Sequence, residues 1–377
     1  DAIDRVSDLL GGLAAAMSWR GEEGGIQAVK AGHEVIMTPN KYCYIDLKQG
    51  QSDLEPNLGY SELLLSTSYN YKVIPDDLTE REGRRIKGIQ ANLWTESISD
   101  WGKLTYMTFP RLYAIAESGW TRHENKDWDD FTNRLVVQLE RLDAEGVRYA
   151  KSAFSPWIEH KAVDSGIELH LKTEVNSLDI HYTLDGTEPT PESASYSGPF
   201  IIENTSTVAA RAFQGGDPVG YLSRLGFYVH KAIGATAKNP KMAQLTDLNY
   251  AGLENGDPNW VTLDTGAEID LVFADPTEVK EVKLDALRWT ISGVYPPETV
   301  TVYGSKDGTA FMKLGETDKT QESRIQGRNR IGYHIAFDPT TLKALRIKPK
   351  EISPVPEGHH HAGREHAIVK MDEVVVN

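Results

Sequence analysis

Residues 14–19, Ala-Ala-Ala-Met-Ser-Trp, decide the fold because they form the first of three short apolar runs separated by helical patterns. A helical stretch follows over Gly25–Ala31 and is closed by Gly32. A second apolar run then covers Glu34–Thr38. Two apolar runs joined by a helix are typical of a β-α-β unit. We therefore predict strands at 14–19 and 34–38 in a parallel α/β sheet or barrel.

The alternation continues to about residue 150. Arg85–Trp94 predicts a third strand, and apolar residues at helical spacing predict helices over Tyr106–Trp120 and Trp128–Gly146. From about Phe154 the helical period gives way to short alternating strands, with an Asp-Gly turn signal at residues 184–186. We divide the chain into an α/β region (1–152), a small β-sandwich (153–231) and a larger β-sandwich (232–377).

Further strands are predicted in both β-regions. They cover Ile167–Leu171, Leu178–Thr183, Thr207–Phe213, Ile269–Phe273, Val279–Leu284, Thr299–Gly304, Ala344–Pro349 and Ile368–Val376. Many short strands with regularly spaced turn signals are typical of all-β sandwiches.

The composition restricts the partners. The formal net charge is −15, whereas binding to nucleic acid requires a positive field. No apolar run is long enough to span a bilayer, so we predict no membrane span and no nucleic acid partner. Cys43 is the only cysteine, which excludes an intramolecular disulfide and a paired-cysteine metal site. A neutral substrate such as a sugar is compatible with this composition.

Aromatic and acidic side chains follow the three predicted strands. Trp19 ends the first strand, Tyr44 and Asp46 follow the second, and Trp94 and Glu96 follow the third. In a β/α barrel these strand ends form the active-site face. Indole faces pack on the C–H faces of a pyranose, and carboxylates accept hydrogen bonds from its hydroxyls. One tryptophan near a strand end is more often a core residue, but the series at three strand ends favours a sugar site.

Six motifs occur in order in this region: Met17-Ser18-Trp19-Arg20-Gly21, Gly24-Gly25-Ile26, Gly32-His33-Glu34-Val35-Ile36-Met37, Tyr44-Ile45-Asp46, Leu93-Trp94-Thr95-Glu96 and Tyr106-Met107-Thr108-Phe109-Pro110-Arg111. Each motif is weak alone, but their order and spacing resemble the family 20 glycoside hydrolases, which include the β-N-acetylhexosaminidases. The resemblance covers residues 1 to about 150. It implies the C-terminal part of a (β/α)8 TIM barrel, with about the last three of its eight units.

The resemblance implies exo-acting, retaining hydrolysis assisted by the substrate, without a cofactor. The substrate's 2-acetamido group attacks the anomeric carbon, and Tyr44 matches the catalytic tyrosine that hydrogen-bonds the acetamide oxygen. Asp46 and Glu96 match residues that bind sugar hydroxyls. Trp19 and Trp94 match the walls of the pocket. The implied substrates are GlcNAc- or GalNAc-terminated glycans.

The family's catalytic Asp-Glu pair, within a His-x-Gly-Gly-Asp-Glu stretch, is the part that this sequence does not show. Its one adjacent Asp-Glu is Asp372-Glu373, near the other end of the chain. We expect the catalytic pair upstream of Asp1 and expect this chain to be inactive alone. A partial barrel leaves an open sheet edge, so we also expect either preceding sequence or a homo-oligomer to cover that edge.

Two further resemblances concern the β-regions. Tyr182–Thr190, Ser195-Tyr196 and Gly198-Pro199-Phe200 resemble the C-terminal sandwich domain of bacterial chitobiases and hexosaminidases. Pieces of residues 232–377 are similar to discoidin-like domains and family 32 carbohydrate-binding modules, namely Leu245-Thr246-Asp247, Trp260, Ile269-Asp270-Leu271, Val302–Gly308 and Met371–Val374. That similarity implies a carbohydrate-binding jelly roll with a structural Ca²⁺ as a candidate ligand. Trp289, Tyr295 and residues 359–364 are candidate ligand positions.

Three functional hypotheses follow. The first is the enzyme hypothesis given above. The second is a non-catalytic carbohydrate-binding or accessory protein, and the third, which the intact pocket residues disfavour, is an adhesion protein with a degenerate barrel. The consecutive residues His359–His361 favour a solvated loop over a metal site, because neighbouring side chains of a strand point to opposite faces. By analogy with glycan-degrading bacterial proteins, we expect a periplasmic, cell-surface or secreted protein.

Overall fold

The computed structural model describes residues 14–50, 55, 61–163 and 166–377 of the chain. The chain divides into two compact units. The first comprises residues 1–158, 171–197 and 209–224, and the second comprises 159–170, 198–208 and 225–377. Each is considered by itself below. The division passes through the small β-region, so the predicted domain boundaries after residues 152 and 231 stay predictions.

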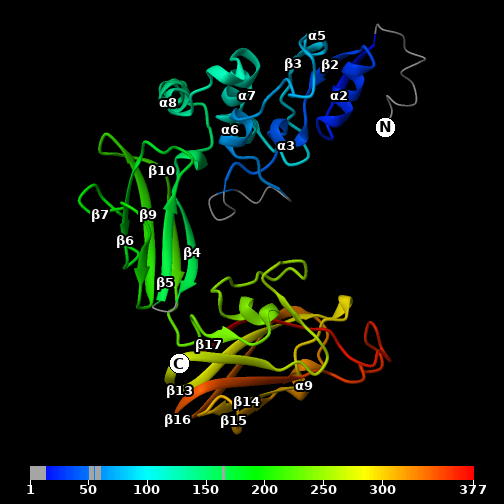
Figure 1. The fold of residues 1–377 in the computed structure, drawn as a ribbon, viewed down its shortest axis with the longest axis vertical. Coiled ribbons are helices and arrows are strands. Elements are labelled where there is room, and N and C mark those ends of the chain that lie inside the picture. The colour runs from blue at the N-terminus through cyan, green and yellow to red at the C-terminus, as the bar shows by residue number, and fades with distance from the viewer. Residues whose placement is uncertain (1–13, 51–54, 56–60, 164–165) are drawn as a thin grey trace. The chain divides into compact units, whose positions relative to one another are not determined.

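The first unit begins with three parallel strands. Strands β1 (Ala15–Ser18), β2 (Glu34–Met37) and β3 (Ile86–Ile89) form a sheet in the order β1-β2-β3, with helix α2 (Glu23–Lys30) between the first two (Figure 1). The parallel β/α arrangement predicted for this region is confirmed. The buried face of the sheet is apolar, with Val35 and Met37 both fully buried.

Further helices belong to this region. They are α3 (Asn40–Cys43), α4 (Leu65–Tyr69), α5 (Glu80–Gly83), α6 (Trp101–Thr108), α7 (Arg111–Trp120) and α8 (Trp128–Ala144). The prediction of one helix over 106–120 is wrong, because α6 ends at Thr108 and α7 begins at Arg111. Pro110 has no backbone N–H and restricts the residue before it, so a continuous helix is broken there. The third strand is also shorter than predicted.

Part of the small β-region lies in the first unit. Strands β6 (Asp179–Thr183), β7 (Ala194–Ser195), β9 (Ser206–Gln214) and β10 (Asp217–Phe227) form a sheet in the order β10-β9-β6-β7. The Asp-Gly turn forms where it was predicted: Gly186 has φ +79°, and Asp185 accepts a 3.0 Å hydrogen bond from the Thr187 amide. It is not a tight hairpin, however, because β7 begins only at Ala194. Helix α8 packs within the same unit, and the Trp128 indole donates to the Glu174 carbonyl.

The other sheet of the small region joins β4 (Trp157–Val163), β5 (Gly166–Lys172) and β8 (Phe200–Ile202). Its last two strands pair antiparallel, with Ile167 opposite Ile202 and Leu169 opposite Phe200. Ile167 and Leu169 are fully buried. Most strands of the two sheets are short, as the sequence predicts, but β9 has 9 residues and β10 has 11.

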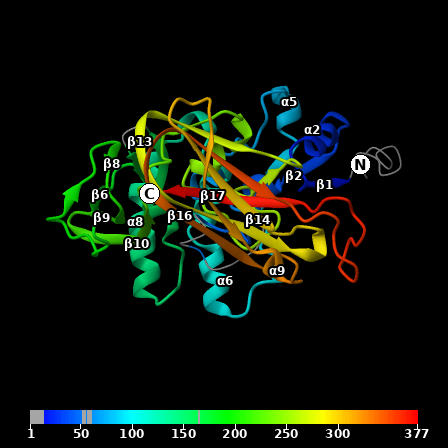
Figure 2. The same ribbon diagram turned by 90° about the horizontal axis from the view of Figure 1, so that it is seen from below.

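An antiparallel sheet of seven strands dominates the second unit. Its strands are β11 (Thr236–Ala237), β12 (Val261–Leu263), β13 (Ile269–Trp289), β14 (Thr299–Ser305), β15 (Met312–Asp318), β16 (Arg328–Lys350) and β17 (Val369–Val376), and the short helix α9 (Thr320–Ser323) precedes β16. Strands β13 and β16 run side by side in both views (Figures 1 and 2). The separate strands predicted at 269–273 and 279–284 are one strand, whose register shifts after Val272 and Val279.

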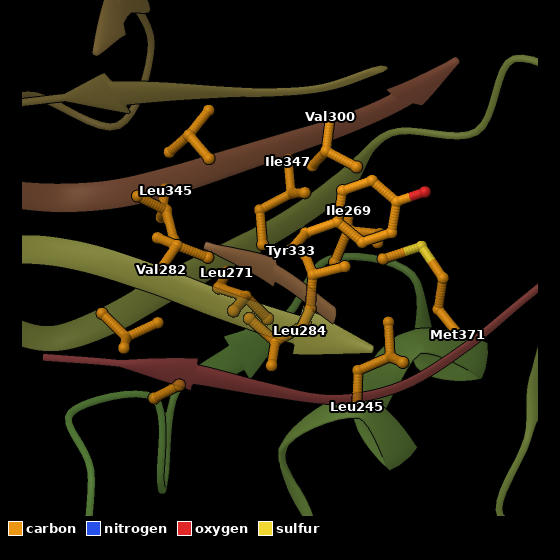
Figure 3. Close-up of a cluster of buried hydrophobic side chains, with 14 of the residues drawn as sticks. Leu245, Ile269, Leu271, Val282, Leu284, Val300, Tyr333, Leu345, Ile347 and Met371 are labelled. Atoms are coloured by element: carbon orange, nitrogen blue, oxygen red, sulfur yellow. The ribbon is translucent and has the colours of Figure 1, made fainter. Parts of the chain in front are cut away.

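The register shifts let the sheet fold over on itself. The first part of β13 pairs with Ala344–Ile347 of β16, and β14 joins that half. The second part pairs with Arg328–Ala336, and β17 joins the other half. Side chains from both halves meet in one apolar core (Figure 3). Its labelled members are Leu245, Ile269, Leu271, Val282, Leu284, Val300, Tyr333, Leu345, Ile347 and Met371. Burial of this core stabilises the fold through the hydrophobic effect.

Candidate active site

The five residues predicted to bind sugar line a single hollow of about 450 Å³ in the first unit. They are Trp19, Tyr44, Asp46, Trp94 and Glu96, and the hollow is completed by Leu47, Ser97, Ile98 and Met107. The structure therefore brings together every residue of the predicted site. Their individual roles stay predictions.

Parallel strand pairing brings two of these residues together. Beyond the ends of β2 and β3 the chain continues as an isolated parallel bridge between Tyr44 and Asn92. The Ile45 amide donates to the Asn92 carbonyl at 2.8 Å, and the Asn92 amide donates to the Cys43 carbonyl at 2.8 Å. The bridge holds Tyr44 close to Trp94, and their ring centroids are 6.1 Å apart. The strand ends thus form one wall of the hollow.

Asp46, which lines the hollow, carries one buried oxygen, Oδ1, that has no hydrogen-bond partner among the described residues. Burial raises the pKa of Asp46 above its ordinary value, the Arg111 charge opposes this rise, and the Glu96 charge adds to it. A buried acceptor without a partner is costly.

The two tryptophans leave much of their surface exposed. Trp19 is 48% exposed and Trp94 is 51% exposed, although both line the hollow. The Arg20 guanidinium lies 4.9 Å from the centroid of the Trp19 ring. Large apolar side chains are usually buried, so two half-exposed indoles in one hollow offer flat apolar surfaces to a ligand.

Ser18 explains why the strand before Trp19 is followed by glycines. Its hydroxyl donates to the Gly21 carbonyl at 2.6 Å and accepts from the Gly25 amide at 2.9 Å, within the first turns of α2. A Cβ atom on Gly25 would lie 2.8 Å from the Met37 sulfur, so a larger residue does not fit there. The close packing of helix and strand fixes the backbone that carries Trp19.

Arg111 has a larger part in this region than the sequence suggested. Arg111 and Glu117 lie in the Tyr-Met-x-Phe-Pro-Arg helix, whose sequence predicts packing and ion-pair contacts for both residues, and Glu117 does pair with Arg134 at 3.0 Å. Arg111 is instead fully buried, and its guanidinium donates to main-chain carbonyls. The Tyr-Met-x-Phe-Pro-Arg motif was the available signal, but it does not reveal the acceptors.

Three further residues near the predicted sites, Cys43, His33 and Tyr295, have structural surroundings. Cys43 is fully buried, and burial raises the pKa of its thiol to about 12, so it is not a reactive thiolate. His33 is 5% exposed beside the start of β2. Tyr295 is fully buried, and its hydroxyl contacts His359 Nδ1 at 3.2 Å and donates to the His360 carbonyl. Tyr295 therefore holds the histidine loop and does not offer its ring to a ligand.

No group of three or more His, Cys, Asp or Glu side chains is placed to hold a metal ion in the part of the chain that the structure describes. In the second unit Asp372 accepts hydrogen bonds from the Ala251 amide and Arg330, and Glu373 accepts from the Leu248 amide. These buried carboxylates are engaged by protein donors, and the structural Ca²⁺ considered from the sequence for the last region finds no support among the described residues. Of the described helices, none combines the length and apolar character that crossing a membrane requires.

Three parallel strands joined by helices, with aromatic and acidic side chains beyond their carboxyl ends, are the arrangement of a segment of a β/α barrel, with the hollow on the face where such barrels carry their sites. Comparison with known proteins agrees with this class. Residues 1–123 match the family "Glycosyl hydrolase family 20, catalytic domain", and residues 159–221 match the "Chitobiase/beta-hexosaminidase C-terminal domain". Two segments of the chain thus match, in this order, a family 20 catalytic domain and a hexosaminidase C-terminal domain.

The similar curated proteins are named as hexosaminidases. A beta-hexosaminidase of Porphyromonas gingivalis is 36% identical over 229 residues, which cover 58% of this chain and 29% of that protein. A beta-N-acetylhexosaminidase of Cellulomonas fimi is 33% identical over 138 residues, which cover 35% of this chain and 26% of that protein. The matches thus span less than a third of the length of either relative.

Parts of the chain also match solved structures. The exo-β-N-acetylglucosaminidase of Vibrio harveyi in complex with N-acetylglucosamine is 36% identical, with a TM-score of 0.34, over 36% of this chain and 22% of that one. A Streptomyces plicatus β-hexosaminidase variant in complex with GlcNAc is 28% identical, with a TM-score of 0.35, over 39% and 31% of the two chains.

Proposed function

We propose that this chain supplies one wall of the sugar pocket of an exo-acting β-N-acetylhexosaminidase, which removes terminal GlcNAc or GalNAc from glycans. The observation that carries the proposal is the convergence of Trp19, Tyr44, Asp46, Trp94 and Glu96 on one hollow. The names of the relatives support the substrate class.

The proposed reaction uses the substrate's own acetamide as the nucleophile. The acetamide carbonyl oxygen forms a bond to the anomeric carbon while the glycosidic C–O bond breaks, and an oxazoline ring results. A general acid donates a proton to the leaving oxygen, and water then opens the ring with retention of configuration. Tyr44 donates a hydrogen bond to the acetamide oxygen, which positions it for attack.

The other four residues bind the sugar ring. The Trp19 and Trp94 indoles pack against its C–H faces. Asp46 accepts from a hydroxyl, which we assign to position 6, and Glu96 accepts from the hydroxyls at position 4 or 3. A hollow that surrounds the non-reducing end accepts the end of a chain and not its middle, which accounts for exo action.

The general acid is the component that the proposal does not assign to this chain. Asp372-Glu373 is its one adjacent Asp-Glu pair, and both residues are buried in the second unit. We therefore propose that the 377 residues bind the sugar but do not hydrolyse its glycosides. We also propose residence in the periplasm, on the surface or outside a bacterial cell.

The second candidate function is non-catalytic binding of carbohydrate by the last region, through the discoidin-like fold proposed from the sequence. The observation that favours it is the pair of Trp289 and Arg328, whose guanidinium lies 4.1 Å from the centroid of the indole. The guanidinium covers one face of this partly buried indole and donates to the Leu253 carbonyl, so a sugar would pack on the opposite face. Among the earlier candidates Trp289 is retained, whereas the fully buried Tyr295 is not.

Saturation-transfer NMR on the whole chain tests the first function. We expect transfer to GlcNAc, and we expect Trp94→Ala to remove it while Trp289→Ala leaves it unchanged. Transfer that depends on Trp289 instead would assign the sugar to the last region and contradict the proposed pocket.

A further inference from the structure

The most extensive polar network beside the hollow belongs to Arg111, the first residue of α7. Arg111 is fully buried, and its guanidinium donates to four main-chain carbonyls. One terminal nitrogen donates to Ile45 at 2.6 Å and to Met107 at 3.0 Å. The other donates to Leu63 at 3.1 Å and to Lys48 at 3.4 Å. Together these bonds join three separate segments of the first unit.

Two of the four carbonyls flank Asp46. The Ile45 carbonyl directly precedes it, and the Lys48 carbonyl lies two residues after it. Tyr44 directly precedes Ile45, so the same contact restrains the backbone of both proposed sugar-binding residues. The third acceptor, Met107, itself lines the hollow. The guanidinium therefore connects Met107 to the loop that carries Tyr44 and Asp46.

Only an arginine can make this set of contacts. The planar fork directs its donors to fixed positions on two nitrogens, whereas the ammonium of lysine is a single compact charge. A buried cation also needs compensation. The groups whose charges act on Arg111 are Glu55, Asp46, Glu174 and Tyr106. Of these, Asp46 is the one that lines the hollow.

We infer that Arg111 is a positioning residue of the sugar site, which sets the geometry of the Tyr44–Asp46 loop through its carbonyl contacts and supplies a buried positive charge that acts on the Asp46 carboxylate. It acts through the loop and contacts no sugar. The inference rests on the proposed function, since it assigns a role to Arg111 in the same hollow.

Two variants separate the geometric role from the electrostatic one. Arg111→Lys keeps the positive charge but loses the fork, and Arg111→Met loses both. We expect both variants to bind GlcNAc at least about tenfold more weakly than the unchanged chain in an NMR titration. The pH below which binding fails should rise by about one unit in Arg111→Met, because an opposite charge near a carboxylate lowers its pKa, and should move little in Arg111→Lys. Arg134→Met, which removes a half-exposed arginine on α8, is the matched control.

Hydrogen exchange supplies a readout that a general loss of stability would not give. In Arg111→Lys the amides of Ile45 and Leu63, which donate to Asn92 and Lys48, should lose protection. The Val35 amide, which donates to Arg85 beside the sheet, should keep it. If neither variant folds, the Arg111 guanidinium protons of the unchanged chain provide the test. The inference requires that these protons exchange slowly with solvent and that they show NMR contacts to residues 45–48. Fast exchange of those protons would overturn it.

The outcomes separate the two proposals. If the unchanged chain binds GlcNAc and the folded Arg111 variants bind it equally well with an unchanged pH profile, the inference on Arg111 fails and the pocket stands. If the unchanged chain does not bind GlcNAc at all, the proposed function fails and the inference fails with it.

Discussion

The rings of Tyr44 and Trp94 lie with their centroids 6.1 Å apart and their planes inclined by 57°. The rings are tilted and not stacked, so neither covers the face of the other. Trp94 remains half exposed while Tyr44 is only 9% exposed. This difference suits an indole that packs against a sugar ring and a phenol whose hydroxyl contacts one substituent of that ring.

Tyr44→Phe tests the contact to the acetamide. We expect GlcNAc to bind about two- to tenfold more weakly, since one hydrogen bond contributes about 0.5–1.5 kcal/mol. The affinity for glucose, which has no acetamide, should not change. NMR titrations with both sugars check this, with Tyr42→Phe as the control, because Tyr42 stacks on Tyr71 and is not among the residues that line the hollow. An equal loss for both sugars would mean that Tyr44 does not recognise the acetamide.

Trp94→Ala tests the wall of the hollow. Loss of the indole removes the apolar surface on which the sugar packs, and we expect the affinity for GlcNAc to fall about tenfold or more. Trp120→Ala is a suitable control, because Trp120 is 92% exposed and does not line the hollow. Tryptophan fluorescence during a GlcNAc titration gives the affinities. A similar affinity in both variants would remove Trp94 from the site.

The pKa of Asp46 gives the site a pH dependence. Because burial raises this pKa, Asp46 becomes protonated at a higher pH than an ordinary aspartate as the pH falls. Its carboxylate then loses acceptor capacity, so the affinity for GlcNAc should decrease as the pH falls through the raised pKa. Asp46→Asn should bind more weakly but without this pH dependence. Measuring the GlcNAc affinity at roughly pH 4 to 8, the range around the ordinary carboxyl pKa and above it, provides the test. If the Asp46→Asn variant keeps the same pH profile, another group must cause it.

The buried contact between Glu373 and His230 predicts a pH-dependent stability. Burial raises the pKa of Glu373 from 4.5 to about 9 and lowers that of His230 from 6.5 to about 4. Glu373 makes its full contribution to the free energy of unfolding below the pKa that it has in the unfolded chain. That contribution is lost as the pH rises through its pKa in the folded chain. The contribution of His230 is complete above its unfolded pKa and is lost as the pH falls through the folded value. The melting temperature should therefore be highest at roughly pH 5–6.

Glu373→Gln isolates the alkaline limb of this profile. The amide oxygen can still accept from the Leu248 amide, but the side chain no longer ionises. We expect the variant to lose less stability than the unchanged chain between pH 6 and about 9. Glu357→Gln, at an exposed position, should retain the original profile. Identical melting curves for the unchanged chain and Glu373→Gln across this range would contradict the assignment.

An assay with p-nitrophenyl-β-GlcNAc tests the assignment of catalysis. We expect no turnover by the 377-residue chain, because no general acid has been assigned to its hollow. Sugar binding should persist in the same preparation. Robust release of p-nitrophenol would show that the chain contains a general acid, and substitution of Glu96 and of Glu22 beside the first strand would then identify it.

Much of the site could be predicted from the sequence. The β-α-β pattern predicts parallel strands, and the carboxyl ends of parallel strands meet on one face. The motif order assigned Trp19, Tyr44, Asp46, Trp94 and Glu96 to that face. Local chemistry also predicted the turn at Asp185-Gly186, because glycine adopts a positive φ without steric cost.

Other features could not be predicted because they depend on contacts between distant residues. The apolar spacing does not predict the break between α6 and α7, because it continues across Pro110. The long strand β13 reads as two strands, because its register shifts interrupt the alternation between core and solvent. Homo-oligomer formation and the discoidin-like assignment of the last region stay predictions.

The sequence by itself determined the parallel β/α framework, the family resemblance and the identities of five pocket residues, because these follow from local periodicity and from motifs read along the chain. Only the tertiary structure decided that the five residues share one hollow, that the buried Asp46 Oδ1 has no partner among the described residues, and that Arg111 donates to the carbonyls of both Ile45 and Met107. The physical reason is that the hydrogen bonds of a buried polar group depend on which groups surround it, and those groups come from segments far apart in the sequence.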